Sequence, residues 1–304
     1  MAAIEQLREF ILRNPSHANV WNTLGTMMAE TGDAANAEIF YREALRLEPR
    51  MARARYNLGN LWMNRGETEA ALREVDAAMK TRLAADEKAM MLLTRGLSQV
   101  TLGRLSEGWR NYEARNDPHF PDCTHFAMDG PRWKPGDDLT GRSLLLIGEQ
   151  GLGDEVLFAS MLPDVLARLG PKGRLTLALE PRLVGLFARS FPTARVESHK
   201  TGSVSGRTVR LIPALAEGGA GIQSWAPIAS LLQDLRPDVA SFPLQDGYLK
   251  PDPERVAHWR RVLETTPPGP KVGLLWKSAV LAAGRQLYFS PFEAWEPVLR
   301  NPGV

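Results

Sequence analysis

Residues 143–158, SLLLIGEQGLGDEVLF, decide the fold of this chain. The apolar run 144–147 ends in a glycine-rich turn, and the acidic Asp154 opens a segment with helical periodicity. This order predicts a strand, a tight loop and a helix N-terminus, an arrangement that directs backbone N–H groups towards an anionic ligand. Helical repeats precede this stretch, and an alternating strand–helix pattern follows it. We therefore expect two architectures that meet here.

Internal repetition marks the first third of the chain. Gly25 recurs as Gly59 and Pro15 as Pro49, each at an offset of 34 residues. A period of 34, with small residues where helices meet, is the signature of the tetratricopeptide repeat (TPR), a pair of antiparallel helices. A third, more degenerate unit contains LGRLSEGWRNYEAR. We expect an α-solenoid of about three helix pairs and a leading helix within residues 3–115.

The repeats predict a binding surface for a protein or peptide. Arrays of this kind form a concave groove. Asparagines on the first helices could pair with the backbone amides of an extended peptide in this groove: Asn22, Asn57, Asn60 and Asn64. A solvated helix face is the alternative for these side chains. The array could also serve mainly as a docking or dimerisation surface.

After the repeats the pattern changes twice. Residues 116–142 are rich in Pro and Gly and have no periodicity, which predicts an irregular linker. Short apolar runs then alternate with helical segments, which is typical of a doubly wound parallel sheet. We expect strands at 144–147, 175–179, 195–197 and 208–212, and helices at 155–169, 181–190, 224–235 and 254–264. Beyond a Pro-rich hinge, a strand at 272–275 and a helix at 291–299 would begin a second α/β domain.

These patterns predict the domain organisation. We expect TPR helical repeats over residues 1–115, a linker over 116–142, a Rossmann-like domain over 143–250, and an interdomain helix with the start of an incomplete second α/β domain over 251–304.

The glycine loop matches neither common nucleotide motif. No Lys-Ser or Lys-Thr pair closes it, as a P-loop requires. Gly151 and Gly153 fit the first two glycines of a dinucleotide fingerprint, but Val156 stands at the third position and Pro171 where an acid is expected. A nicotinamide-dependent enzyme is therefore disfavoured. A loop that holds a substrate, or positions a catalytic acid at the carboxyl end of the first strand, fits better.

Asp154 is the candidate catalytic residue. As a helix N-cap it would contribute ~1 kcal/mol, and this structural role is compatible with catalysis. In its ionised form the carboxylate can accept a proton from a sugar or protein hydroxyl. The other candidate substrate-binding residues of the loop are Glu149, Gln150, Gly151 and Gly153. Glu149 and Gln150 could bond an acceptor hydroxyl, or could satisfy loop amides instead.

A family resemblance extends this interpretation. WKPGDDLTGRSLLLIGEQGLGDEVLF resembles the junction in bacterial TPR-linked glycosyltransferases, and SEGWRNYEAR and VGLLWKS are also similar to that family. The resemblance covers roughly residues 20–302 and implies a GT-B fold of the heptosyltransferase-like group. It implies that Asp154 is the general base and that Lys277 and Arg285 lie near the donor diphosphate. Solvated surface cations are the alternative for the last two.

The resemblance also implies a function. It implies a metal-independent glycosyltransferase that moves a sugar from a nucleotide-sugar to a protein or glycan acceptor. No Asp-x-Asp motif is present, and we expect neither a metal nor another cofactor. Since GT-B enzymes bind the donor mainly with their second domain, we expect the 304-residue chain to be inactive alone. A non-catalytic TPR scaffold with a degenerate transferase domain is the alternative, because KSAVLAAGRQLYFSP replaces the Gly-Asn-rich stretch of many relatives.

Composition sets looser limits. A net charge of +2, without a dense Lys/Arg block, gives no sign of nucleic-acid binding. The single cysteine, Cys123, excludes an intrachain disulfide. No apolar run approaches the ~18 residues of a membrane-spanning helix. The first residues, with Glu5 and Glu9, are unlike a secretory signal, so a cytoplasmic protein is expected.

Overall fold

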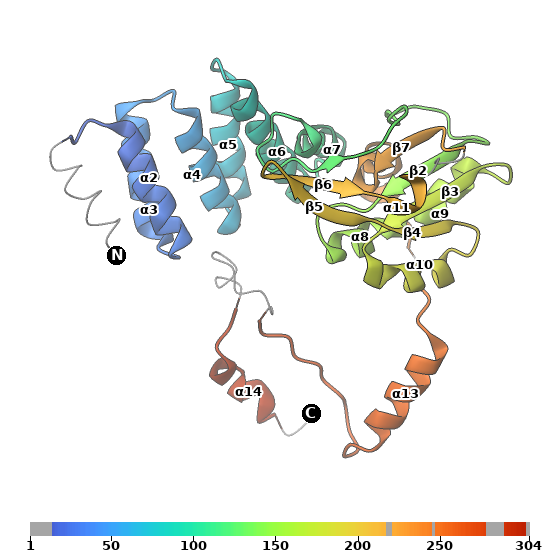
Figure 1. Ribbon diagram of the computed structural model, residues 1–304. Coiled ribbons are helices and arrows are strands. Elements are labelled where there is room, and N and C mark those ends of the chain that lie inside the picture. Colours follow the sequence, from blue (N-terminus) through green and yellow to red (C-terminus); the bar gives the residue numbers. More distant parts are fainter. Residues whose placement is uncertain (1–13, 217–220, 245–246, 278–288, 302–304) are drawn as a thin grey trace. The chain divides into compact units, whose positions relative to one another are not determined.

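The computed structural model describes residues 14–216, 221–244, 247–277 and 289–301 (Figure 1). The chain is divided into two compact units. One is formed by residues 82–252 and the other by the residues before 82 and after 252. The leading helix expected before Pro15 falls largely outside the described residues.

Two TPR helix pairs form the N-terminal unit's repeats: α2 (Ala18–Glu30) with α3 (Ala34–Leu47), and α4 (Ala52–Asn64) with α5 (Thr68–Met79). Corresponding helices begin 34 residues apart, as the repeat predicts. Gly25 is required by packing, since a Cβ there would lie 2.5 Å from Cε1 of Tyr41 on the paired helix. Gly32 and Gly66 close the two inter-helix turns with φ angles of 86° and 79°, which suit glycine.

A third helix pair belongs to the unit of residues 82–252. It consists of α6 (Ala85–Thr101) and α7 (Leu105–Tyr112), and the short helix η1 (Glu113–Asn116) continues α7. Backbones meet in this pair: a Cβ on Gly96 would lie 2.6 Å from the amide nitrogen of Tyr112 and 2.9 Å from the carbonyl oxygen of Gly108. Trp109 and Tyr112 pack in the same apolar core as the sheet that follows.

A four-stranded parallel sheet is the centre of this unit. Its strands are β2 (Ser143–Ile147), β3 (Arg174–Leu179), β4 (Arg195–Ser198) and β7 (Ser224–Pro227), in the order β4-β3-β2-β7. Of these strands β2 comes first in the sequence. The next two, β3 and β4, are added on one side of β2, and β7 is added on its other side. The order therefore reverses between β2 and β7, and the crevice outside their carboxyl ends is where ligands bind in such sheets.

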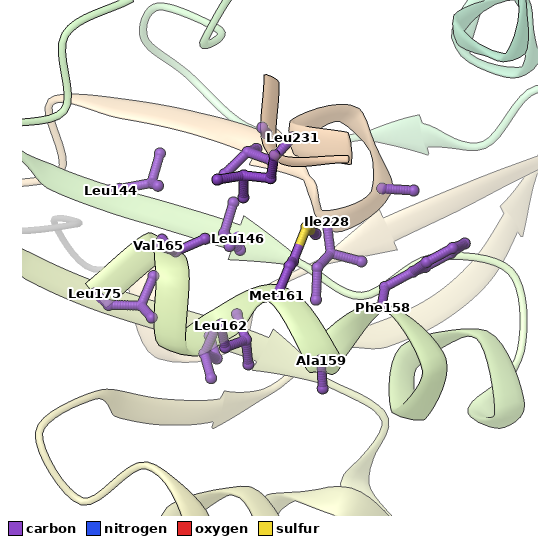
Figure 2. Packing of buried hydrophobic residues seen from close by; sticks show 14 of the residues in the cluster. Leu144, Leu146, Phe158, Ala159, Met161, Leu162, Val165, Leu175, Ile228 and Leu231 are labelled. Atoms are coloured by element: carbon purple, nitrogen blue, oxygen red, sulfur yellow. The ribbon is translucent and has the colours of Figure 1, made fainter. Parts of the chain in front are cut away.

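The two faces of β2 belong to different cores because strand side chains alternate. Leu144 and Leu146 pack against the helices α8 (Leu152–Phe158) and α9 (Leu162–Leu169), as Figure 2 shows around Met161. The short helix η2 (Ala159–Met161) interrupts what we expected as one helix over 155–169. On the opposite face, Leu145 and Ile147 pack in a second cluster that includes Phe126 and Trp225.

A small second sheet corrects the expected strand set. It has the order β1-β6-β5, with β1 (His125–Phe126), β5 (Lys200–Val204) and β6 (Arg207–Leu211). The strand expected at 208–212 is thus β6, which pairs antiparallel with β5 and lies outside the parallel sheet. The hairpin turns at Ser205 and Gly206, with φ angles of 51° and 78°. Polar, exposed β5 has no apolar pattern by which the sequence could show it.

Two further expectations were wrong in detail. The segment 224–235 begins as a strand, because Trp225 and Ala226 pair with Leu145 and Leu146 of β2. It becomes helical only at η4 (Ile228–Leu231) and α12 (Leu232–Leu235). Residues 272–275 form no strand, and within the described chain Val272 and Leu275 are exposed without a pairing partner.

Most of the remaining helices lie where the pattern placed them. The helix α10 (Val184–Ser190) follows the short helix η3 (Pro181–Leu183), and α13 (Pro253–Glu264) was expected at 254–264. The segment 291–299 contains η7 (Phe292–Trp295) and α14 (Glu296–Leu299). Two short helices were not expected, α11 (Pro213–Ala216) and η5 (Val239–Ser241). The expected domain boundaries, including a second α/β domain in 251–304, stay a prediction.

Candidate functional site

The residues between β2 and α8, 148–151, form the loop at the carboxyl end of β2, which we call the switch-point loop. Gly148 has no room for a side chain, because a Cβ would lie 2.3 Å from a carboxylate oxygen of Glu155. Gln150 adopts φ of 59°, a left-handed conformation that is uncommon for a residue other than glycine. Hydrogen bonds from Tyr112 and Arg210, outside the loop, hold this conformation.

Asp154 lies in the first turn of α8 and is half-buried. Gly151, and not Asp154, is the N-cap, but Asp154 caps the helix from the third position: the Gly151 N–H donates to its Oδ2 over 3.0 Å. This corrects the expected N-cap role while keeping the capping interaction. Within the described chain Oδ1 accepts no hydrogen bond. The structural cap thus leaves one carboxylate oxygen for chemistry.

Both carboxylate oxygens of Glu149 accept hydrogen bonds from other protein groups. Its side chain is buried, and Arg115 donates to both carboxylate oxygens, from Nε to Oε2 over 2.6 Å and from Nη2 to Oε1 over 2.9 Å. The Ala229 N–H, just after β7, donates to Oε1 over 2.7 Å. Glu149 therefore joins both sides of the switch point to the end of the third helix pair. Of its two expected roles, the structure displays the one that satisfies neighbouring protein groups.

Two carboxylates balance the charge of Arg115, one from the buried Glu149 and one from the half-buried Glu113. Burial disfavours the charged form of Arg115, yet the adjacent Glu149 and Glu113 raise its pKa above the ordinary value. Burial alone would raise the pKa of Glu113, but Arg115, the Ser230 hydroxyl and Arg132 outweigh it and lower that pKa. Both groups are therefore held in their charged forms.

Gln150 is exposed, and its side chain and its backbone carbonyl form hydrogen bonds with two other elements. Its Nε2 donates to the Tyr112 hydroxyl over 2.8 Å, and its carbonyl oxygen accepts from Arg210 Nη2 over 3.4 Å. Arg210 also donates to the carbonyl of Gly148. Burial raises the pKa of Tyr112 to about 12 and lowers that of Arg210.

A buried pair that the sequence did not single out lies beside the loop. His199 Nε2 and Glu155 Oε1 are 3.0 Å apart, both side chains are almost fully buried, and Glu155 Oε2 accepts from the N–H of Glu180 over 2.9 Å. The sequence also failed to indicate Tyr112, Arg115 and Arg210. Tyr112 and Arg115 stand in SEGWRNYEAR, but only the fold shows which loop they reach.

Three of the four candidate groove asparagines line one pocket. Asn57, Asn60 and Asn64 line a pocket of about 300 Å³ together with Tyr41 and other residues of α2, α3 and α4. Asn22 is buried instead, and its Oδ1 accepts from Asn57 Nδ2 over 3.0 Å. Of the predicted set, Asn22 is therefore a buried hydrogen-bonding residue, and Asn57, Asn60 and Asn64 line the pocket.

The role of the two candidate donor-site cations, Lys277 and Arg285, stays a prediction. Lys277 is exposed in a stretch without regular secondary structure. Arg285 lies outside the described residues. Gly153 is exposed, and a Cβ there would meet nothing within 4 Å. Among the residues the structure describes, no group of three or more His, Cys, Asp or Glu side chains could hold a metal ion. None of the described helices is both long and apolar enough to cross a bilayer.

Comparison with known proteins identifies the class of the N-terminal region. A tetratricopeptide repeat model matches residues 1–49 and 41–88, so this region consists of TPRs, which imply protein binding. Over 302 residues, 99% of this chain, the sequence is 47% identical to protein FlbA of Caulobacter vibrioides and covers 50% of it. The chain is therefore related to FlbA and spans about half the length of this curated relative.

Solved structures show distant similarity. MamA is 20% identical with a TM-score of 0.33, over 37% of this chain and 64% of MamA. YrrB, described as a TPR protein with an unusual peptide-binding site, is 20% identical with a TM-score of 0.32, over 38% of this chain and 63% of YrrB. The O-GlcNAc transferase of Thermobaculum terrenum is 16% identical with a TM-score of 0.32, over 57% and 32% of the respective chains.

Proposed function

We propose that this chain is part of a TPR-containing glycosyltransferase that transfers a sugar from a nucleotide-sugar to a protein or glycan acceptor. The position of Asp154 is the observation that carries the proposal. Asp154 follows the first strand of a doubly wound sheet, beside the switch point, and one of its carboxylate oxygens accepts no hydrogen bond within the described chain. Ligands bind at this edge of such sheets. The sequence resemblance to TPR-linked glycosyltransferases supports the same reaction.

Asp154 would act as general base. Its unbonded Oδ1 takes the proton of the acceptor hydroxyl while the hydroxyl oxygen attacks the anomeric carbon of the donor. The bond between that carbon and the diphosphate oxygen breaks, and the diphosphate leaves with the electron pair. Cations near the diphosphate would stabilise its charge, a role we propose for Lys277 and Arg285. Gln150, Gly151 and Gly153 would complete the acceptor side of the site.

The repeats would hold the protein partner. The pocket beside Asn57, Asn60 and Asn64 combines amide side chains with the apolar surface of Tyr41 and Leu61. Amides can pair with the backbone of an extended peptide in any sequence, while the apolar part takes a side chain. We therefore propose an extended segment of a partner protein as the occupant.

A non-catalytic scaffold is the second candidate, and one observation favours it. Glu149, a candidate substrate contact, is buried and bonded to Arg115 and Ala229, so protein groups occupy part of the space outside the carboxyl ends of β2 and β7. In that function the repeats would still bind a partner, while the α/β unit would serve as a rigid base.

The two candidates are separated by donor binding and transfer. A protein of the length of FlbA that contains this chain would be titrated with a panel of nucleotide-sugars by calorimetry, and transfer to a co-purified partner protein would be followed by mass spectrometry. Binding of one donor with a mass increase of one sugar on the partner supports the transferase. Tight partner binding with no donor binding would support the scaffold and contradict the transferase.

A further inference from the structure

The third helix pair reaches the switch-point loop through two side chains near its end. We propose that Tyr112 and Arg115 are positioning residues, which hold the switch-point loop and, through it, Asp154 in the working conformation. The statement about the loop rests on geometry alone. The consequence for catalysis rests on the proposed transferase function.

Arg115 fixes the loop at Glu149. The planar guanidinium matches both carboxylate oxygens, which orients as well as binds. Arg115 is itself held by Glu113 Oε1 over 2.9 Å and by the carbonyl of Tyr112 over 3.1 Å. Because both side chains are buried, the pair cannot exchange its bonds for water without exposing Glu149.

Tyr112 fixes the loop at Gln150. The left-handed backbone of Gln150 is held at the side chain by Tyr112 and at the carbonyl by Arg210. The next residue, Gly151, donates its N–H to the Asp154 carboxylate. A continuous series of hydrogen bonds and one peptide link therefore runs from Tyr112 to Asp154.

The helix pair is itself anchored to the sheet's unit. The Trp109 Nε1–H donates to the carbonyl of Arg236 over 2.8 Å, at the end of α12. At Gly96 and Gly108 the two helices approach so closely that a Cβ on either residue would clash with the other helix, so α7 packs directly on α6. Tyr112 and Arg115 thus act from a fixed support, as positioning residues must.

Hydrogen exchange of the full chain tests the proposal without a substrate. Tyr112→Phe removes the acceptor for Gln150 and keeps the buried ring, and Arg115→Lys keeps the charge and removes the planar fork. In both variants the amides of residues 148–155 should exchange roughly 3- to 10-fold faster, the change expected for a lost hydrogen bond. The matched control is Tyr248→Phe, which removes a hydroxyl bonded to the Val156 carbonyl of α8 and should leave 148–151 unchanged.

Unchanged exchange of 148–155 in Tyr112→Phe would overturn the proposal, and this variant decides if Arg115→Lys does not fold. The catalytic part has its own readout in a protein of FlbA length. There Tyr112→Phe should lower kcat roughly 3- to 10-fold with little change in KM for the donor. Faster exchange with unchanged kcat would overturn the catalytic part. Absence of transfer in the unmodified protein would refute the proposed function and leave the exchange result to decide loop positioning.

Discussion

The guanidinium of Arg115 donates to both oxygens of the Glu149 carboxylate, at 2.6 and 2.9 Å, in a buried pair whose members are 34 positions apart in the chain. Arg115 lies in η1, which continues the third helix pair, and Glu149 follows the first strand of the parallel sheet. The pair is one physical reason why that helix pair and the sheet form one compact unit. It also means that the loop before Asp154 depends on a helical neighbour.

Loss of this ion pair should be costly. Arg115→Ala leaves the buried Glu149 carboxylate without its partner, and we expect the free energy of unfolding to fall by about 3 kcal/mol. Urea denaturation followed by circular dichroism measures this. Arg182→Ala is the control, because Arg182 is largely exposed in its pair with Glu180 and should change stability by less than about 1 kcal/mol. Equal effects of the two variants would show that the buried pair has no special role.

Gly96→Ala should destabilise the chain although alanine favours helices. The new Cβ would press on the backbone of α7 at 2.6 Å, and such overpacking costs about 1–3 kcal/mol. Gly185→Ala, on α10, is the matched control, since its Cβ would meet only Arg189 Nη1 at 3.6 Å. That change should be neutral or stabilising by up to about 1 kcal/mol. Thermal unfolding of both variants gives the comparison, and a stabilising Gly96→Ala would refute the close helix contact.

Tyr112 should make stability depend on alkaline pH. Its folded pKa is raised by burial to about 12, whereas a tyrosine in the unfolded chain titrates near about 10. The unfolded chain therefore loses this proton first, so the contribution of Tyr112 is complete below about pH 10 and is lost as the pH rises towards about 12. The difference in absorbance at the tyrosinate band between the unmodified chain and Tyr112→Phe reports the titration. A midpoint near 10 in the folded chain would contradict the buried hydroxyl.

The asparagines of the repeats should differ in their effects. Asn22→Ala removes the buried acceptor of Asn57 Nδ2, and we expect a loss of about 1 kcal/mol in the free energy of unfolding. Asn64→Ala changes an exposed pocket residue and should alter stability by less than about 0.5 kcal/mol. Chemical denaturation of the two variants tests this division. A larger loss for Asn64→Ala would reverse the roles assigned here.

Local signals predicted much of this fold. The 34-residue period predicted the four helices α2 to α5, and the apolar runs predicted β2 and β3. These elements are predictable because their residue patterns lie within the element or its repeat. Residues 224–227, SWAP, form a strand because they pair with β2. The short run, which contains Pro227, has no sequence pattern that predicts a strand. The polar hairpin strand β5 is defined by its turn and its partner β6.

The candidate site was predictable only in part. Asp154 could be proposed because a glycine loop before a helix has a local signature. The commitment of Glu149 to Arg115, and the pairing of Glu155 with His199, depend on contacts between segments far apart in sequence. No spacing rule gives such pairs, so the sequence could not distinguish a substrate ligand from a buried structural acid.

The role of Asp154 as general base is the central claim, and its replacement tests it most directly. Asp154→Asn keeps an oxygen that can accept the Gly151 N–H and removes the base, and Asp138→Asn, which keeps an acceptor for the Thr140 N–H, is the matched control. In a protein of FlbA length with a bound donor, we predict that Asp154→Asn lowers kcat for sugar transfer by at least about 100-fold at unchanged unfolding midpoint, while Asp138→Asn has no effect. Transfer by Asp154→Asn at the rate of the unmodified protein would contradict the account.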